Sequence, residues 1–114
     1  MPGGANQKAN GMKVSWSKRA GDAVVRTSIY ILNTFGPKAR EDFLQAVQHA
    51  SELLEDNPFL GPIEPLLIQK PQQYRSVVVS RLNKIVYYVK GNTIKISAFW
   101  DTRKEPKAQA RKVK

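Results

Sequence analysis

Three runs of β-branched and aromatic residues fill the stretch from Tyr74 to Pro106, and they constrain the fold more than any other feature of the chain. Short, turn-prone breaks separate the runs, and Gly91-Asn92 is well placed to form a tight hairpin between the second run and the third. This spacing predicts a meander of three antiparallel strands in the C-terminal half.

Successive side chains along a strand point to opposite faces of the sheet. In the last run, this alternation predicts a core face made of Ile94, Ile96, Ala98 and Trp100. In each run, one of the two alternating sets of side chains carries the cations. If these sets share one face, the opposite, open face is made of Arg75, Val77, Val79, Lys84, Val86, Tyr88, Lys95, Ser97, Phe99 and Arg103. A surface both basic and apolar favours a partner that covers it, either a protein with an apolar stripe and acidic edges or a polyanion.

Two amphipathic helices are expected before the meander. Apolar residues recur at helical spacing from residue 17 to residue 35, where Ser15 or Ser17 can serve as the N-cap, and again from residue 37 to residue 56. Gly36-Pro37 between them is the pair preferred where one helix ends and another begins, and Asn57-Pro58 ends the second helix.

The short segment Met12–Trp16 is expected to add an edge strand to the meander. The order β, α, α, β, β, β then predicts an α+β fold with two layers, in which a helical hairpin packs on one face of an antiparallel sheet. The helices would cover the face that carries Ile94, Ile96 and Trp100.

A chain of 114 residues corresponds to one domain, which we expect to span residues 12–106. The first eleven residues are polar and rich in Gly and Asn, so we expect them to be disordered. They also lack the apolar stretch of a signal peptide. Residues 107–114 are expected to form a basic, flexible tail. The chain has no cysteine and no apolar run near the roughly 20 residues that cross a bilayer, which favours a cytoplasmic protein.

The net charge of +10 is unevenly distributed. Residues 1–35 carry five cations and one anion, a net charge of +4. Residues 36–69 carry two cations and six anions, a net charge of −4, and residues 70–114 carry twelve cations and two anions, a net charge of +10. The excess therefore lies on the meander and the tail, where it would attract an anionic partner.

Several kinds of site are not indicated by the sequence. It contains no Gly-rich phosphate loop, no His/Cys/carboxylate set at metal spacing and no Ser-His-Asp arrangement, so neither a cofactor nor a metal is expected. The one histidine, His49, is expected in the second helix, far from the open face.

Five short features follow one another between Lys13 and Pro106: Trp16 with Ala20, Phe35-Gly36, Asn57-Pro58 with Gly61, Tyr74-Arg75, and Asp101 with Arg103. In the order and spacing of these features, the chain resembles the RelE/ParE superfamily of toxins from bacterial type II toxin–antitoxin modules.

The resemblance implies a small basic protein that halts growth when free and is silenced by a cognate antitoxin, a small acidic protein. Apolar side chains of the predicted open face would accept the antitoxin's apolar residues. The antitoxin-binding residues would then be Val77, Val79, Val86, Tyr88 and Phe99.

Members of the superfamily differ in their target. RelE-like members cleave messenger RNA on the ribosome, which requires a base for the attacking 2′-hydroxyl, cations for the phosphate and an acid for the leaving oxygen. ParE-like members bind and poison DNA gyrase. Target or phosphate binding would fall to Arg75, Lys84, Lys95, Arg103 and Lys104.

The resemblance to the nuclease pattern is incomplete. Arg75, Lys84 and Arg103 match positions where RelE-like members keep a cation, and Tyr88 is a weak candidate for an acid or a stacking residue. However, Val77 replaces a second strand lysine, and Lys104-Glu105-Pro106 stands where a helix would supply a tyrosine. Arginine and surface lysine stay protonated at neutral pH and cannot move the protons.

Three hypotheses follow. The first is a ParE-like toxin that acts by binding gyrase and is not an enzyme. The second is a metal-independent ribosome-dependent ribonuclease, and the third is a general nucleic-acid-binding module without toxicity.

Overall fold

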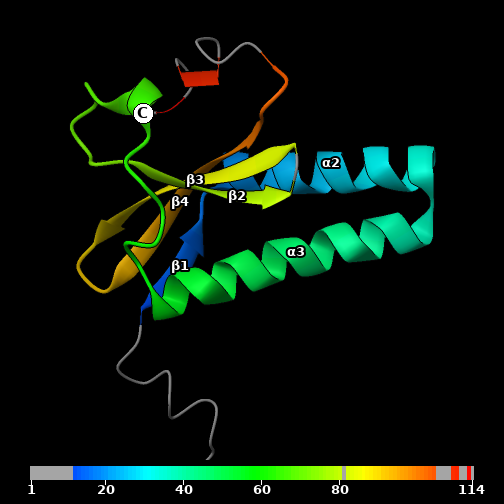
Figure 1. Cartoon of the computed structure of the whole chain (residues 1–114), viewed down its shortest axis with the longest axis horizontal. Helices are drawn as coiled ribbons and strands as arrows, with labels where there is room; N and C mark the ends of the chain where they lie inside the picture. Colours follow the sequence, from blue (N-terminus) through cyan, green and yellow to red (C-terminus); the bar gives the residue numbers. More distant parts are fainter. Residues whose placement is uncertain (1–11, 81, 105–108, 111–112, 114) are drawn as a thin grey trace, which may run out of the picture.

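The computed structural model describes residues 12–80, 82–104, 109–110 and 113. They form a four-stranded sheet with two long helices on one face (Figure 1). The elements are β1 (Lys13–Trp16), α2 (Lys18–Phe35), α3 (Pro37–Asp56), a short 3-10 helix (Pro65–Leu67), β2 (Arg75–Ser80), β3 (Asn83–Lys90) and β4 (Thr93–Asp101). The predicted α+β architecture is confirmed.

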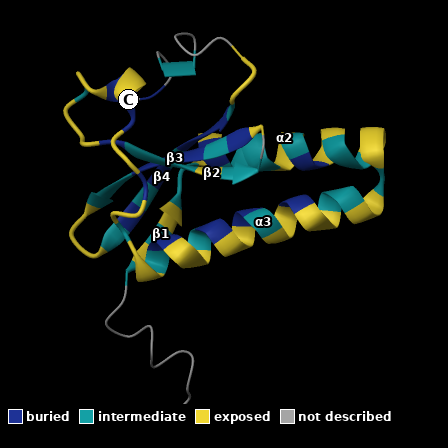
Figure 2. Cartoon of the chain, viewed as in Figure 1, coloured by how far each residue is buried: buried dark blue, intermediate teal, exposed yellow. Residues whose placement is uncertain are grey.

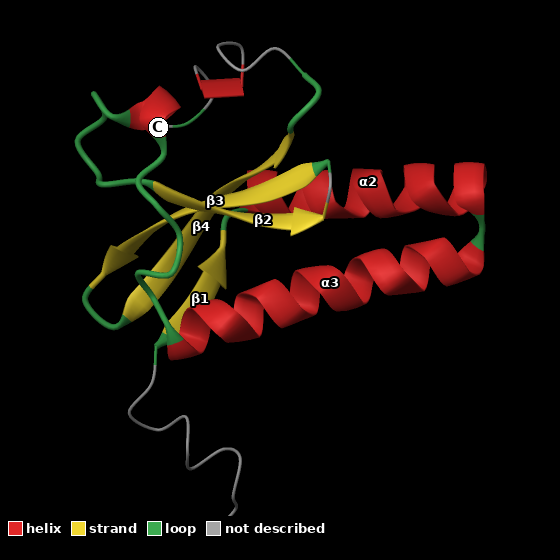
Figure 3. Ribbon diagram, viewed as in Figure 1, coloured by secondary structure: helices red, strands yellow, loops and turns green. Residues whose placement is uncertain are grey.

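The two helices form the predicted hairpin. Ser17 caps α2, because its hydroxyl accepts a hydrogen bond from the Ala20 amide at 3.1 Å. Gly36 separates the helices with φ of 98°, a conformation that favours glycine, and Pro37 opens α3. Figure 3 shows the far end of the hairpin extending well beyond the sheet. No helix in the described ranges is both long and apolar enough to cross a bilayer.

The sheet order is β1-β4-β3-β2. The meander is antiparallel as expected, with the β3–β4 turn at Gly91, where φ is 61°. The predicted edge strand β1 is also present, but it runs parallel to β4, which makes the sheet mixed. The long path from β1 through both helices to the meander permits this parallel pairing.

The main core lies between the helices and one face of the sheet, here called the helix face. Phe43, Val47, Ala50 and Leu54 form the buried stripe of α3, which is visible along that helix in Figure 2. Phe99 of β4 packs edge to face against Phe43, with ring centres 5.9 Å apart. The other buried members of this core are Ala20, Ile85, Tyr87, Ile94 and Ile96.

A β-bulge changes the phase of β4. Val86 is opposite Ala98 whereas Tyr87 is opposite Ile96, so Ser97 is an extra residue on β4. Ile94 and Ile96 therefore lie on the helix face as predicted, but Phe99 follows them there, while Ala98 and Trp100 lie on the other face. The predictions for Phe99, Ala98 and Trp100 were wrong, because strict alternation does not include a bulge.

The predicted phase of β2 was also wrong. Val77 pairs with Ile85 and Arg75 pairs with Tyr87, so the register places Arg75, Val77 and Val79 on the helix face. Of the residues in and just before β2, it is Tyr74, Ser76 and Val78 that share a face with Lys84 and Val86. The positions of the cations did not reveal which side chains lie on the same face of the sheet. The pairing register between strands decides this, and the charge of the side chains does not.

A second apolar cluster lies on the opposite face of the sheet, here called the open face. Its buried members are Leu67, Tyr74, Val86, Ala98, Trp100 and Val113. The connection between α3 and β2 crosses this face, as the green trace in Figure 1 shows. Part of the face that the sequence predicts to be uncovered is therefore covered by the chain itself.

The two predicted terminal segments lie largely outside the described residues. Residues 1–11 are not described at all. Of the predicted tail, Val113 is 4% exposed and packs on the open face, and the Gln109 side chain accepts a hydrogen bond from the Asp101 amide and donates one to its carbonyl.

Candidate functional site

Arg75, Lys84 and Arg103, the three cations of the predicted phosphate site, lie in three different surroundings. Arg75 is on the helix face, Lys84 is on the open face, and Arg103 follows the end of β4. The structure does not bring them together into one site.

Arg75 holds the connection after α3. Its guanidinium donates a hydrogen bond to the Gly61 carbonyl at 2.8 Å and lies 5.1 Å from the centre of the Phe59 ring. Beside it, the Tyr87 hydroxyl donates to the Pro58 carbonyl at 2.8 Å and accepts from the Gly61 amide at 3.0 Å. Burial raises the pKa of Tyr87, although the Gly61 hydrogen bond opposes the shift. These contacts give Arg75 and Tyr87 a structural role.

Lys84 forms an ion pair with Glu64, a residue that the sequence analysis did not single out. The Glu64 side chain is 1% exposed, and its carboxylate also accepts hydrogen bonds from the Ser76 hydroxyl at 2.9 Å and the Leu66 amide at 3.1 Å. The Lys84 ammonium lies 5.1 Å from the centre of the Trp100 ring. This network pins the connection to the open face.

Burial opposes ionisation of Glu64, but the hydrogen bonds from Lys84, Leu66 and Ser76 outweigh it and hold the pKa of this carboxyl below its ordinary value. The ionised carboxylate is buried between the connection and the sheet, out of contact with solvent. One sequence signal was available, because Glu64 is the single charged residue between Asn57 and Gln69 in an otherwise apolar and proline-rich segment.

Arg103 pairs with Asp101 through two hydrogen bonds of 3.1 and 2.9 Å, and the hydrogen bonds from Arg103 hold the pKa of Asp101 below its ordinary value. Asp101 raises the pKa of Arg103, and Tyr30 of α2 adds to the shift. Lys104 is exposed in the same turn.

The predicted antitoxin-binding side chains are mostly engaged within the domain. Val77, Val79 and Phe99 pack in the helix-face core, and Val86 is fully buried in the open-face cluster. Tyr88 is half-buried on the open face, where its ring meets that of Tyr74 edge to face at 5.4 Å.

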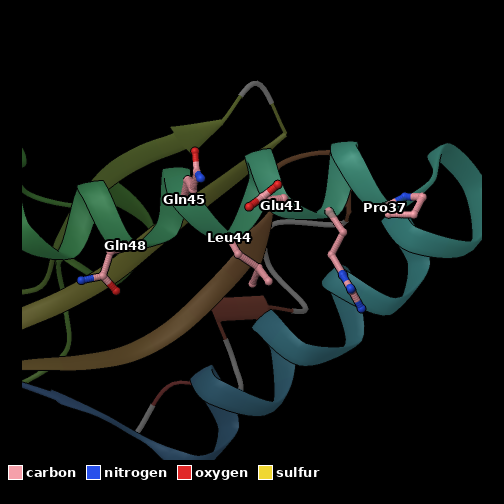
Figure 4. A pocket seen from close by; sticks show the side chains of 6 residues that line it. Pro37, Glu41, Leu44, Gln45 and Gln48 are labelled. Carbon is pink, nitrogen blue, oxygen red and sulfur yellow. The ribbon is translucent and has the colours of Figure 1, made fainter.

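Exposed apolar side chains lie on the helical hairpin, in the connection after α3 and near the β2–β3 turn. On α2, Val25, Ile29 and Phe35 are 55%, 52% and 67% exposed. On α3, Leu44 is 41% exposed and lines a shallow groove of about 510 Å³ together with Pro37, Arg40, Glu41, Gln45 and Gln48. In Figure 4, Leu44 points from α3 toward the side on which α2 lies.

Lys95 is the predicted target-binding cation that remains on the open face without an acidic partner among the described residues. Two other strand lysines, Lys13 of β1 and Lys90 of β3, lie on either side of Thr93, two residues before Lys95 on β4. The sequence analysis did not select these two, although alternation with Val14 and Val89 was a signal that they point away from the core. No group of His, Cys, Asp and Glu suited to a metal occurs within the described residues.

Comparisons with known proteins show the fold. A chain from the chromosomal ParDE toxin–antitoxin (TA) system of P. aeruginosa superposes with a TM-score of 0.65 at 19% sequence identity, and the match covers 79% of this chain and 95% of that one. No protein-family model and no curated protein matches the sequence. The structure thus has the RelE/ParE-like fold that the sequence features indicated.

Proposed function

We propose that this chain is the toxin of a bacterial toxin–antitoxin module, that it acts by binding its target, and that the target is DNA gyrase. The observation that carries the proposal is the fold shared with a chain of the ParDE system along nearly the whole of that chain.

The chemistry of the sheet favours binding over bond cleavage. Among the described residues, the two strand cations of the nuclease pattern have other partners, since Arg75 holds Gly61 and Lys84 holds Glu64. The carboxylate nearest to Lys84 is buried and ionised, and His49 is an exposed residue of α3. RNA cleavage by the 2′-hydroxyl needs a base and an acid on either side of the phosphate, and the candidate acid of the sequence analysis, Tyr88, packs edge to face against Tyr74.

The exposed apolar surface of the helical hairpin supports an antitoxin partner. Val25, Ile29 and Phe35 are exposed on α2, and Leu44 lines a groove on α3. Exposed apolar side chains of this kind suit the apolar face of an amphipathic helix. The net charge of +10 favours an acidic partner.

A supercoiling assay with purified gyrase and the full-length protein tests the target. We expect supercoiling to be inhibited as the protein is titrated to excess, while ribosome-bound message remains intact. Cleavage of the message without inhibition of gyrase would identify a ribonuclease and reject the proposal.

Growth assays test the antitoxin surface. Induced expression should stop growth, and co-expression of a small acidic protein from the same operon should restore it. The Ile29→Asp variant should remain toxic but escape neutralisation, whereas Asn33→Asp, an exposed change of equal charge on the same helix, should still be neutralised. Equal neutralisation of both variants would place the antitoxin elsewhere.

A further inference from the structure

We propose that Lys13, Lys90 and Lys95 form a binding surface for the phosphate backbone of a nucleic acid on the uncovered half of the open face. This inference goes beyond the proposed function and does not depend on which protein the chain inhibits.

The strand register gathers the three lysines. Lys13 and Lys90 both lie beside Thr93, one on each side of β4, and Lys95 lies two residues further along that strand. At a strand separation of about 4.8 Å, the backbones of Lys13 and Lys90 are about 10 Å apart, and Lys95 is about 7 Å along the strand from their row. Three positive charges from three strands thus share one small area.

All three side chains point to the open face. Val14, Val89 and Ile94, their neighbours in the chain, pack in the helix-face core, so the alternating positions face away from it. The bulge at Ser97 lies beyond Lys95 and does not disturb this phase.

No carboxylate of the described residues neutralises these lysines. Glu64 is paired with Lys84 and Asp101 with Arg103. The acidic side chains of α3 belong to the layer on the other side of the sheet, and they are Glu41, Asp42, Glu52, Glu55 and Asp56. The molecule is therefore polarised, with positive charge on the open face, and its field would guide a polyanion to that face.

The chemistry of this area favours phosphate over an acidic protein segment. Beside the lysines stand the hydroxyl groups of Ser15 and Thr93, which can donate to phosphate oxygens. The described large apolar residues with high exposure lie on the helices, in the connection after α3 and near the β2–β3 turn, but not here. A protein partner would need an apolar centre, and the apolar half of this face is already covered by Leu67 and Val113.

Fluorescence anisotropy with the full-length protein and a labelled 20-nucleotide single strand, in DNA and RNA forms, tests the surface across a salt series. The triple variant Lys13→Gln, Lys90→Gln, Lys95→Gln should bind at least about tenfold more weakly at low salt, and its log–log salt slope should fall by about 2. The matched control Lys18→Gln, Arg26→Gln, Lys38→Gln removes the same charge from the helices and should change binding less than about twofold.

Equal weakening by both triple variants, or none by the first, would overturn the proposal, because general charge or the basic C-terminal residues would then account for binding. Competition by polyglutamate as strong as that by unlabelled oligonucleotide would also overturn it, in favour of an acidic protein segment. If the triple variant does not fold by circular dichroism, the exposed single changes Lys13→Gln and Lys90→Gln should each still weaken binding by about threefold, and no change in either would reject the surface.

Discussion

Glu64 and Lys84, twenty residues apart, form an ion pair in which the Glu64 side chain is 1% exposed and the Lys84 side chain is 22% exposed. The pair joins the connection after α3 to β3 on the open face. It also removes Lys84 from the candidates for phosphate binding, because its charge is already balanced.

The Glu64→Gln variant should lower the free energy of unfolding by about 3 kcal/mol, because it leaves Lys84 without its buried counter-charge. Urea denaturation measures the loss. In the double variant Glu64→Gln, Lys84→Met much of the stability should return, since no unpaired charge remains. If the double variant loses more unfolding free energy than the two single variants lose together, the pairing is contradicted.

The same pair makes stability depend on acid pH. The folded pKa of Glu64 lies below its ordinary value of 4.5. Its contribution is therefore fully present above pH 4.5 and is lost as the pH falls through the lower, folded pKa. Urea unfolding of wild type between pH 7 and pH 3 should show a decline below about pH 4.5 that is smaller in Glu64→Gln. Parallel curves for the two proteins would show that other carboxyls cause the decline.

Gly61 should not tolerate a side chain. A Cβ at this position would lie 2.4 Å from the Ser76 carbonyl oxygen and 2.9 Å from Val77 Cγ1, so Gly61→Ala must displace the connection from β2. We expect a loss of about 1–3 kcal/mol in thermal or urea unfolding. Gly21→Ala is the matched control, since nothing lies within 4 Å of its Cβ and alanine in a helix should stabilise by about 0.5–1 kcal/mol.

The Tyr87 hydroxyl should matter more than that of Tyr88. Tyr87→Phe removes the bonds to the Pro58 carbonyl and the Gly61 amide, and should cost about 1–3 kcal/mol because both groups lose a buried partner. Tyr88→Phe, on the half-exposed open face, should change the unfolding free energy by less than about 0.5 kcal/mol. If both changes lower the unfolding free energy equally, the Tyr87 hydroxyl does not stabilise the connection as proposed.

The sequence by itself determined the elements. The spacing of Phe43, Val47, Ala50 and Leu54 defined α3, Gly36-Pro37 defined the helix junction, and the three β-branched runs defined the meander, because each of these signals is local and arises from backbone geometry and side-chain period.

Only the tertiary structure decided which side chains share a surface. The extra residue at Ser97 moved Phe99 to the helix face and Trp100 to the open face, the β2–β3 register separated Arg75 from Lys84, and Glu64 found Lys84 across twenty residues. Parallel pairing of β1 with β4 brought Lys13 beside Lys90 and Lys95. Register and pairing depend on contacts between residues far apart in the chain, and the period of a single strand does not contain that information.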